Sequence, residues 1–200
     1  MAAGHRRWIR WCALASLLAV AACGRAAGEV GSAMPAPADQ AAIDANAERL
    51  RAGAAGASFD RADLRGADLR GASLAGASLR FSRLDRADLT GADLRGAQLT
   101  GAELAGAVLR RADLSGADLS GAQLGGADLT DGDLSGSNLS GASMRGAETG
   151  GARFAGALLS WAYFADVDLR RSDLTGACWS PAQPPHWPPG YTPPPPGPTC

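Results

Sequence analysis

The side chains in this sequence that could do chemistry are carboxylates, arginines and a few cysteines. Its 200 residues include 20 Asp and Glu, 19 Arg with no Lys, four Cys and two His. His5 and His186 lie near opposite ends of the chain, so the usual bases and nucleophile activators are missing from its middle. Neither a phosphate-binding glycine loop nor a metal-binding spacing of Cys and His occurs. We therefore expect no enzyme activity, no catalytic residue and no cofactor.

One short segment, residues 131–136, matches the first half of a calcium-binding EF-hand loop. The twelfth position of such a loop supplies a bidentate Glu, but here that position is Ala142. The segment also falls in register with a repeat that runs through the surrounding sequence. We therefore expect no metal site.

The repeat is a five-residue unit that recurs twenty-five times from 57 to 181 without an insertion or a deletion. Nineteen central positions are Leu, twenty units begin with Ala and sixteen end in Gly. A period of five scatters the leucines around a helix and alternates them across a strand. It builds a core if each unit is a short extended piece followed by a corner, with Ala and Leu inward and the residue between them outward.

These units resemble the pentapeptide-repeat family, whose motif is Ala-(Asp/Asn)-Leu-x-x. Residues 62–64, 67–69 and 117–119 match that motif literally. The resemblance implies an all-β fold, a right-handed quadrilateral β-helix of about six coils in which residues twenty apart stack. The repeats would occupy 57–181, after a signal peptide at 1–22 and a lipidated Cys, linker and capping helix at 23–56. A Pro-rich tail at 182–200 would follow them.

Stacking at intervals of twenty predicts a column of acidic side chains on one outward face. Gyrase-protecting members of the family present such surfaces as DNA mimics, so a cytoplasmic protein that binds DNA gyrase is the alternative function. Arginines on the same faces favour ordinary solvated charge, and with a net charge of −1 we expect no nucleic acid partner. The column consists of Asp68, Asp88, Asp128, Glu148 and Asp168.

The first 22 residues have the pattern of an export signal, with three arginines before an apolar run too short to span a bilayer. The run ends in Val20-Ala21-Ala22-Cys23, which resembles the bacterial lipobox. The resemblance implies a lipid on Cys23 that anchors the chain to a bilayer of the bacterial envelope. Because Gly24 rather than Asp follows, it favours the outer over the inner membrane. Simple secretion is the alternative.

Residues 37–52 have the pattern of a short helix, with Asp39 as N-cap and Ile43, Ala47 and Leu50 on one face. Solenoid ends expose apolar side chains and need covering. We expect this helix to cover the first coil at Phe59. A helix that binds a partner is the alternative.

Near the end of the repeats Leu158, Trp161 and Tyr163 point outward at one corner, where they would form an exposed apolar patch. The patch is interpreted as a bed for the tail or as a contact in a homodimer through the C-terminal coils. Residues 182–200 are rich in Pro and stiff. They would form a cap folded on the rod, or a ligand for an aromatic groove on a partner.

Three further residues carry specific expectations. Cys178, at an outward position, is predicted to form a disulfide with Cys200 that folds the tail back, or Cys200 pairs between molecules. Thr149 is the one polar residue at a central position, and we expect it to be a core defect. On this view Thr149→Leu would stabilise the protein by about 1 kcal/mol.

These observations together favour a non-enzymatic envelope lipoprotein that acts as a rod-like protein-binding or spacing module. Its partners would be the bilayer, through Cys23, and an unidentified envelope protein.

Overall fold

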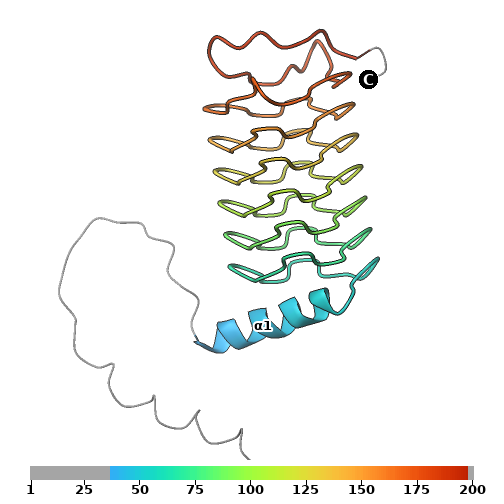
Figure 1. The fold of residues 1–200 in the computed structure, drawn as a ribbon, viewed down its shortest axis with the longest axis vertical. Coiled ribbons are helices and arrows are strands. Elements are labelled where there is room, and N and C mark those ends of the chain that lie inside the picture. Colours follow the sequence, from blue (N-terminus) through green and yellow to red (C-terminus); the bar gives the residue numbers. More distant parts are fainter. Residues whose placement is uncertain (1–36, 198–200) are drawn as a thin grey trace, which may run out of the picture. The chain divides into compact units, whose positions relative to one another are not determined.

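The computed structural model describes residues 37–197, with side chains from residue 40. The export signal, Cys23 and Cys200 lie outside the described residues. In this part of the chain the only helix is α1, Pro37–Arg51, which lies at one end of a stack of coils (Figure 1). The helix begins at Pro37, where the missing amide hydrogen of proline is tolerated. Asp39 is therefore inside the first turn, and its expected role as N-cap is wrong.

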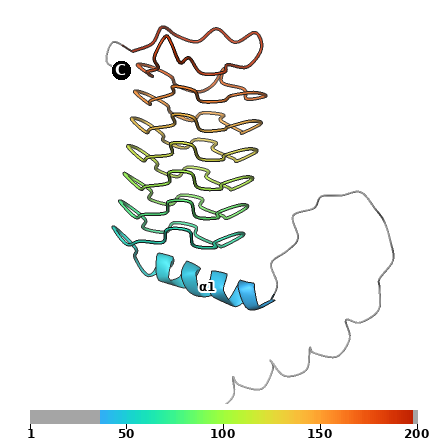
Figure 2. The same ribbon diagram turned by 180° about the vertical axis from the view of Figure 1, so that it is seen from behind.

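The repeats form coils that stack along one axis, as Figures 1 and 2 show from two sides. Single parallel bridges join residues twenty apart, for example Asp118 and Asn138. The Leu119 amide donates to the Asn138 carbonyl over 2.8 Å, and the Asn138 amide donates to the Ala117 carbonyl over 2.9 Å. Four five-residue units therefore make one turn. The paired pieces are isolated bridges, too short to form extended strands, and the architecture is the expected β-helix solenoid.

The inside of each coil is filled by the central and first residues of its units. Leu119 and Ala117 are both fully buried, and the same holds with few exceptions along the stack. Pairing a large with a small side chain at each level lets the narrow interior close without a channel. The inward and outward positions thus agree with the assignment made from the five-residue period.

The chain turns each corner with a tight turn between the central residue and the next unit. The Ala67 amide donates to the Leu64 carbonyl over 3.1 Å, and Gly66 between them has a φ of 64°. A positive φ at the third position of such a turn is the geometry for which glycine is suited. The sixteen glycines at the ends of the units are explained by this one requirement.

Helix α1 covers the first coil. Its buried residues Ile43, Ala47 and Leu50 belong to the same apolar core as Phe59. The Arg49 guanidinium lies 5.3 Å from the centre of the Phe59 ring, and Arg51 Nε donates to the Asp68 carbonyl over 2.6 Å. Helix α1 therefore covers the first coil, as the sequence predicted.

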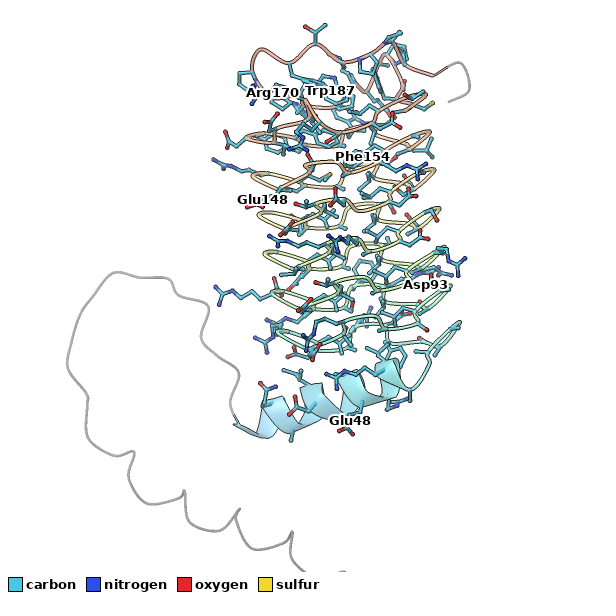
Figure 3. All side chains as sticks on the ribbon, viewed as in Figure 1. Glu48, Asp93, Glu148, Phe154, Arg170 and Trp187 are labelled. Atoms are coloured by element: carbon cyan, nitrogen blue, oxygen red, sulfur yellow. The ribbon has the colours of Figure 1, made fainter. Side chains whose placement is uncertain are left out.

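The opposite end is covered by the Pro-rich segment, which turns back across the last coil. His186 joins Tyr163 in a parallel bridge, and its carbonyl accepts a hydrogen bond from the Phe164 amide over 2.9 Å. The Trp187 ring stacks on Phe164 with centres 5.3 Å apart and planes 7° from parallel, and it meets Trp179 edge-on at 5.2 Å. The labels in Figure 3 place Phe154 below this layer and Trp187 within it.

Cys178 is disulfide-bonded, and its predicted partner Cys200 lies outside the described residues. Its side chain is buried, with 2% of its surface exposed, although its position in the unit is an outward one. Cys178 therefore keeps the outward position in its unit but is covered from outside. The reason is the returning tail, whose Gly197 amide donates to the carbonyl of Ala177 over 2.9 Å.

The ladder of backbone hydrogen bonds is interrupted once inside the described repeats, between 147–151 and 167–171. At this level Val167 and Ser172 occupy positions that are usually Ala. The Thr149 hydroxyl donates to the Asp168 carbonyl over 3.0 Å, and the Ser172 hydroxyl donates to the Thr149 carbonyl over 2.8 Å. Thr149 is buried, but its hydroxyl has a partner, so the expected core defect does not include an unpaired polar group.

Candidate interaction surfaces

The acidic column follows one face of the stack. Asp68 bridges to Asp88, and Asp128 bridges to Glu148, with Val108 between the two pairs. Asp168 has no bridge to Glu148, because the ladder is interrupted there. Figure 3 labels Glu148 on this column, together with Asp93 on the neighbouring acidic face. The sequence therefore placed these carboxylates correctly, but the column contains one apolar residue and one break.

Arginines neutralise most of this column. Arg70 binds Asp68 through two hydrogen bonds of 2.8 Å and lies 3.7 Å from the Asp88 carboxylate. Arg110 pairs with Asp128, and Arg170 binds Asp168 through bonds of 2.8 and 2.7 Å. Among these carboxylates only Glu148 has no arginine within ion-pair distance in the described residues. The face is a set of paired charges rather than a uniform negative surface.

The same contacts determine how these groups titrate. Hydrogen bonds from the Arg170 side chain lower the pKa of Asp168 to about 2, and those from Arg70 lower the pKa of Asp68 further. Partial burial alone would raise the pKa of Asp128, but hydrogen bonds from Thr130 and Arg110 bring it below 3.8. A general acid needs a pKa near the working pH, and these shifts are in the opposite direction.

No metal-binding group of three His, Cys, Asp or Glu residues exists in the described part of the chain. The two carboxylates of the EF-hand-like segment, Asp131 and Asp133, lie in different surroundings. Asp133 accepts a hydrogen bond from the Ser135 amide over 2.9 Å and pairs with Arg153 at 3.2 Å, whereas Asp131 occupies an exposed corner with a φ of 57°. Their placement agrees with solenoid register and not with a calcium loop.

A hollow of about 380 Å³ lies between the last coil and the returning tail. It is lined on one side by residues 166–170, where the ladder is interrupted, and on the other by 188–191. Burial raises the pKa of Tyr191 in this wall. Arg170 and Asp168 in the lining are bonded to each other, so the hollow presents little free charge.

The largest exposed hydrophobic side chains share one edge of the solenoid, here called the aromatic edge. It contains Leu158, Trp161 and Tyr163, as the sequence indicated, with 41%, 53% and 41% of their surfaces exposed. The tail contacts only part of the aromatic edge. The His186 ring lies 5.5 Å from the Tyr163 ring, whereas the Trp161 side chain remains exposed to solvent. The patch is thus not a complete bed for the tail.

The fourth member of the aromatic edge, Phe81, was missed by the sequence reasoning. It is 55% exposed and lies at the same corner as Trp161, four coils earlier. The signal was present, because both residues end their units and their numbers differ by a multiple of twenty. Phe81 is isolated along the chain from the other aromatic residues of the repeats, so only its stacking position relates it to Trp161.

The family model for pentapeptide repeats matches the chain in eight copies, over residues 57–96, 92–131, 122–148 and 150–178. Among solved structures, HetL from the cyanobacterium Nostoc sp. strain PCC 7120, a pentapeptide repeat protein involved in heterocyst differentiation regulation, is 31% identical. The alignment covers 62% of this chain and 67% of HetL, with a TM-score of 0.51. A comparison with curated proteins found no match.

Two other solved structures are less similar in shape. A pentapeptide repeat protein from the thylakoid lumen of Arabidopsis thaliana is 32% identical over 62% of this chain and 73% of its own, with a TM-score of 0.44. The plasmid-mediated fluoroquinolone resistance protein QnrB1 is 19% identical over 63% of this chain and 80% of its own, with a TM-score of 0.25. Neither supports an argument about function.

Proposed function

The chain belongs to the pentapeptide-repeat family, and from this premise we propose that it is a non-enzymatic lipoprotein of the bacterial envelope. It acts as a rod-like module that binds a partner protein or holds one at a distance from the membrane.

The observation that carries the proposal is the closed interior of the solenoid. Central side chains such as Leu119 are fully buried, and the outward carboxylates of Asp128 and Asp168 have lowered pKa values. A convex surface without an enclosed site favours recognition over catalysis. A partner protein could bind to the outward faces or edges of such a rod, and the length of the rod could set its distance from the membrane.

The anchoring part of the proposal rests on the sequence around Cys23. An apolar run that ends in Val20-Ala21-Ala22-Cys23 resembles a lipobox, and acylation at the new N-terminus would attach the rod to a bilayer. No helix in the described residues is both long and apolar enough to cross a membrane. With coils about 4.8 Å apart, the repeats would extend roughly 30 Å from such an anchor.

Binding to DNA gyrase as a DNA mimic is the less favoured function. Mimicry needs a continuous negative surface, and the arginines at 70, 110 and 170 interrupt the acidic column. An exported protein would also be separated from cytoplasmic gyrase.

Metabolic labelling with radioactive palmitate tests the proposal. The wild-type protein should carry label and fractionate with the envelope, Cys23→Ala should lose the label, and Cys12→Ala should keep it. Cys12→Ala is the matched control, because it removes a cysteine from the same signal region. An unlabelled wild-type protein in the cytoplasmic fraction that inhibits supercoiling would instead establish the gyrase function.

A further inference from the structure

The aromatic edge has a composition that no other edge of the solenoid shares. Its corner positions in successive coils are Phe81, three glycines and then Trp161. The other three corners carry only Gly, Arg or Asp at these positions in the described repeats. All four large hydrophobic side chains that are exposed in the described residues lie at this corner or on the two faces beside it, and together they make up the aromatic edge.

Phe81 and Trp161 are held in an unfavourable backbone conformation. Their φ angles are 55° and 62°, in the left-handed region that bulky side chains rarely adopt. Both rings also expose half or more of their surface to solvent. Glycine would avoid both costs and is present at most corners, so stability does not explain these two aromatic residues. Residues kept in strained, exposed conformations point to a binding role.

The strip between the two rings is smooth and polar. Gly101, Gly121 and Gly141 form its crest, and hydroxyl residues lie beside each of them. The Phe81 ring lies along the crest, since a Cβ on Gly101 would come within 2.6 Å of two of its carbons. Four coils at about 4.8 Å place the two rings roughly 19 Å apart along the axis. The hydroxyl residues are Thr100, Ser120, Ser140 and Ser160.

An extended peptide is a poor occupant for this strip. Addition of a strand requires free backbone groups, but the amides of Gly101, Gly121 and Gly141 already donate to the coil above over 2.8 to 2.9 Å. A second copy of the chain is also a poor fit. Two convex edges touch only along a line, and stable protein interfaces bury about 800 Å² on each partner.

A linear polysaccharide fits the aromatic rings and the polar groups of the strip. Each pyranose ring has an apolar face of C–H groups that stacks on an aromatic ring, and a rim of hydroxyls that bonds to polar side chains. The flanking faces supply amides from Gln98, Asn138 and Gln123, with the Asp118 carboxylate between Gln98 and Asn138. That carboxylate accepts hydrogen bonds from the side chains of Thr100 and Asn138 over 2.9 and 3.2 Å, and it disfavours an anionic ligand. Arg83 and Glu103 on the other face lie 3.4 Å apart and neutralise each other. We infer that the aromatic edge binds a linear, neutral β-1,4-linked glycan between Phe81 and Trp161.

This inference goes beyond the proposed function, because it requires neither the lipid on Cys23 nor a particular compartment. Calorimetric titration of the purified full-length protein with chitohexaose and cellohexaose, and with the corresponding trisaccharides, tests it. Only the longer chains reach both rings, so at least one hexasaccharide should bind about tenfold more tightly than its trisaccharide. Phe81→Gly should remove this preference for length, and Trp161→Gly should weaken binding of both lengths.

Arg111→Gly is the matched control. Arg111 has a φ of 55° at a different corner, so its replacement relieves the same backbone strain without touching the aromatic edge. This variant should bind like the wild type, and all three should retain the wild-type circular dichroism spectrum. The inference is overturned if neither hexasaccharide binds, or if the double variant Phe81→Gly/Trp161→Gly binds as well as the wild type. It is equally overturned if sedimentation shows a dimer that only the double variant abolishes, because the edge would then join two copies.

Discussion

The Thr149 hydroxyl donates a hydrogen bond to the backbone carbonyl of Asp168, at the level where the other coils use a backbone amide. A side chain thus replaces a missing ladder bond inside the core, where Thr149 is only 2% exposed. We therefore expect substitution of Thr149 to destabilise the protein, whereas the sequence alone predicted that Thr149→Leu would stabilise it.

We predict that Thr149→Val lowers the free energy of unfolding by about 1 to 2 kcal/mol, because the backbone carbonyl of Asp168 loses its donor. Thr149→Leu should also destabilise, since it adds bulk as well as removing the bond. Urea denaturation measures both, with Ser143→Ala, an outward hydroxyl, as the control. A gain in stability for Thr149→Leu would restore the view of this position as a simple defect.

Inward and outward positions in one unit should respond differently to substitution. Leu124 is fully buried, and Leu124→Asp would place a carboxylate in the apolar column without a donor, at a cost of several kcal/mol. Gln123 is exposed, and Gln123→Ala should change stability by less than about 0.5 kcal/mol. Chemical denaturation compares the two, and equal losses would contradict the assignment of the faces.

Asp168 should make stability depend on pH in the acid range. Its pKa is about 2 in the folded protein, below the ordinary value of 3.8, because Arg170 bonds to the carboxylate. A lowered pKa gives stability that is present above pH 4 and is lost as the pH falls toward 2. The melting temperature of the wild type should therefore exceed that of Asp168→Asn at pH 6 and converge with it as the pH falls to 2 and below.

The difference between wild type and Asp168→Asn should be small and should shrink in high salt, because the ion pair is exposed. Asp131→Asn serves as the control, since Asp131 has no arginine contact in the described residues. A difference that persists unchanged at pH 2 would show that Asp168 acts by some route other than its charge.

The disulfide of Cys178 should stabilise the C-terminal end locally. A bond to Cys200 would close a loop of 200 − 178 + 1 = 23 residues and contribute roughly 3 kcal/mol in the chain-entropy model. Mass spectrometry after non-reducing digestion should identify the pair. In Cys178→Ser, hydrogen exchange should speed up at the amides of Phe164 and His186 and stay unchanged at Leu119. Two free thiols, or a linked dimer on a non-reducing gel, would contradict the intramolecular pair.

The register of the solenoid can be changed without altering its core. Deleting residues 122–141 removes one full coil and leaves Phe81 and Trp161 on the same corner. Deleting residues 122–126 removes one unit and moves Trp161 to the next corner. Both variants should fold, because each deletion keeps the five-residue register and so leaves the central position of every remaining unit facing inward, but only the first should keep the preference for longer glycans. Failure of both to fold would show that the coils are not interchangeable.

Most of the fold could be predicted from the sequence because one local rule repeats. Leu and Ala at fixed places in each unit determine what points inward, and Gly determines where the chain turns, as at Gly66. The partner of Thr149 could not be predicted, because it depends on how Val167 and Ser172 alter the neighbouring coil. The burial of Cys178 was missed for a similar reason, since the covering tail follows no repeat. The role of Phe81 in the aromatic edge could be recognised only by comparing residues at the same corner four coils apart, because no other aromatic residue of the edge lies near it along the chain.

The two covered ends have a consequence for assembly. A stack of parallel bridges with an open end presents unpaired amides and carbonyls, which can template the addition of further chains as in a fibril. In this protein α1 closes one end, and the segment around His186 and Trp187 closes the other. A solenoid made of nearly interchangeable units is thereby kept at a finite length, and removal of either cover would expose an end that can seed end-to-end polymerisation.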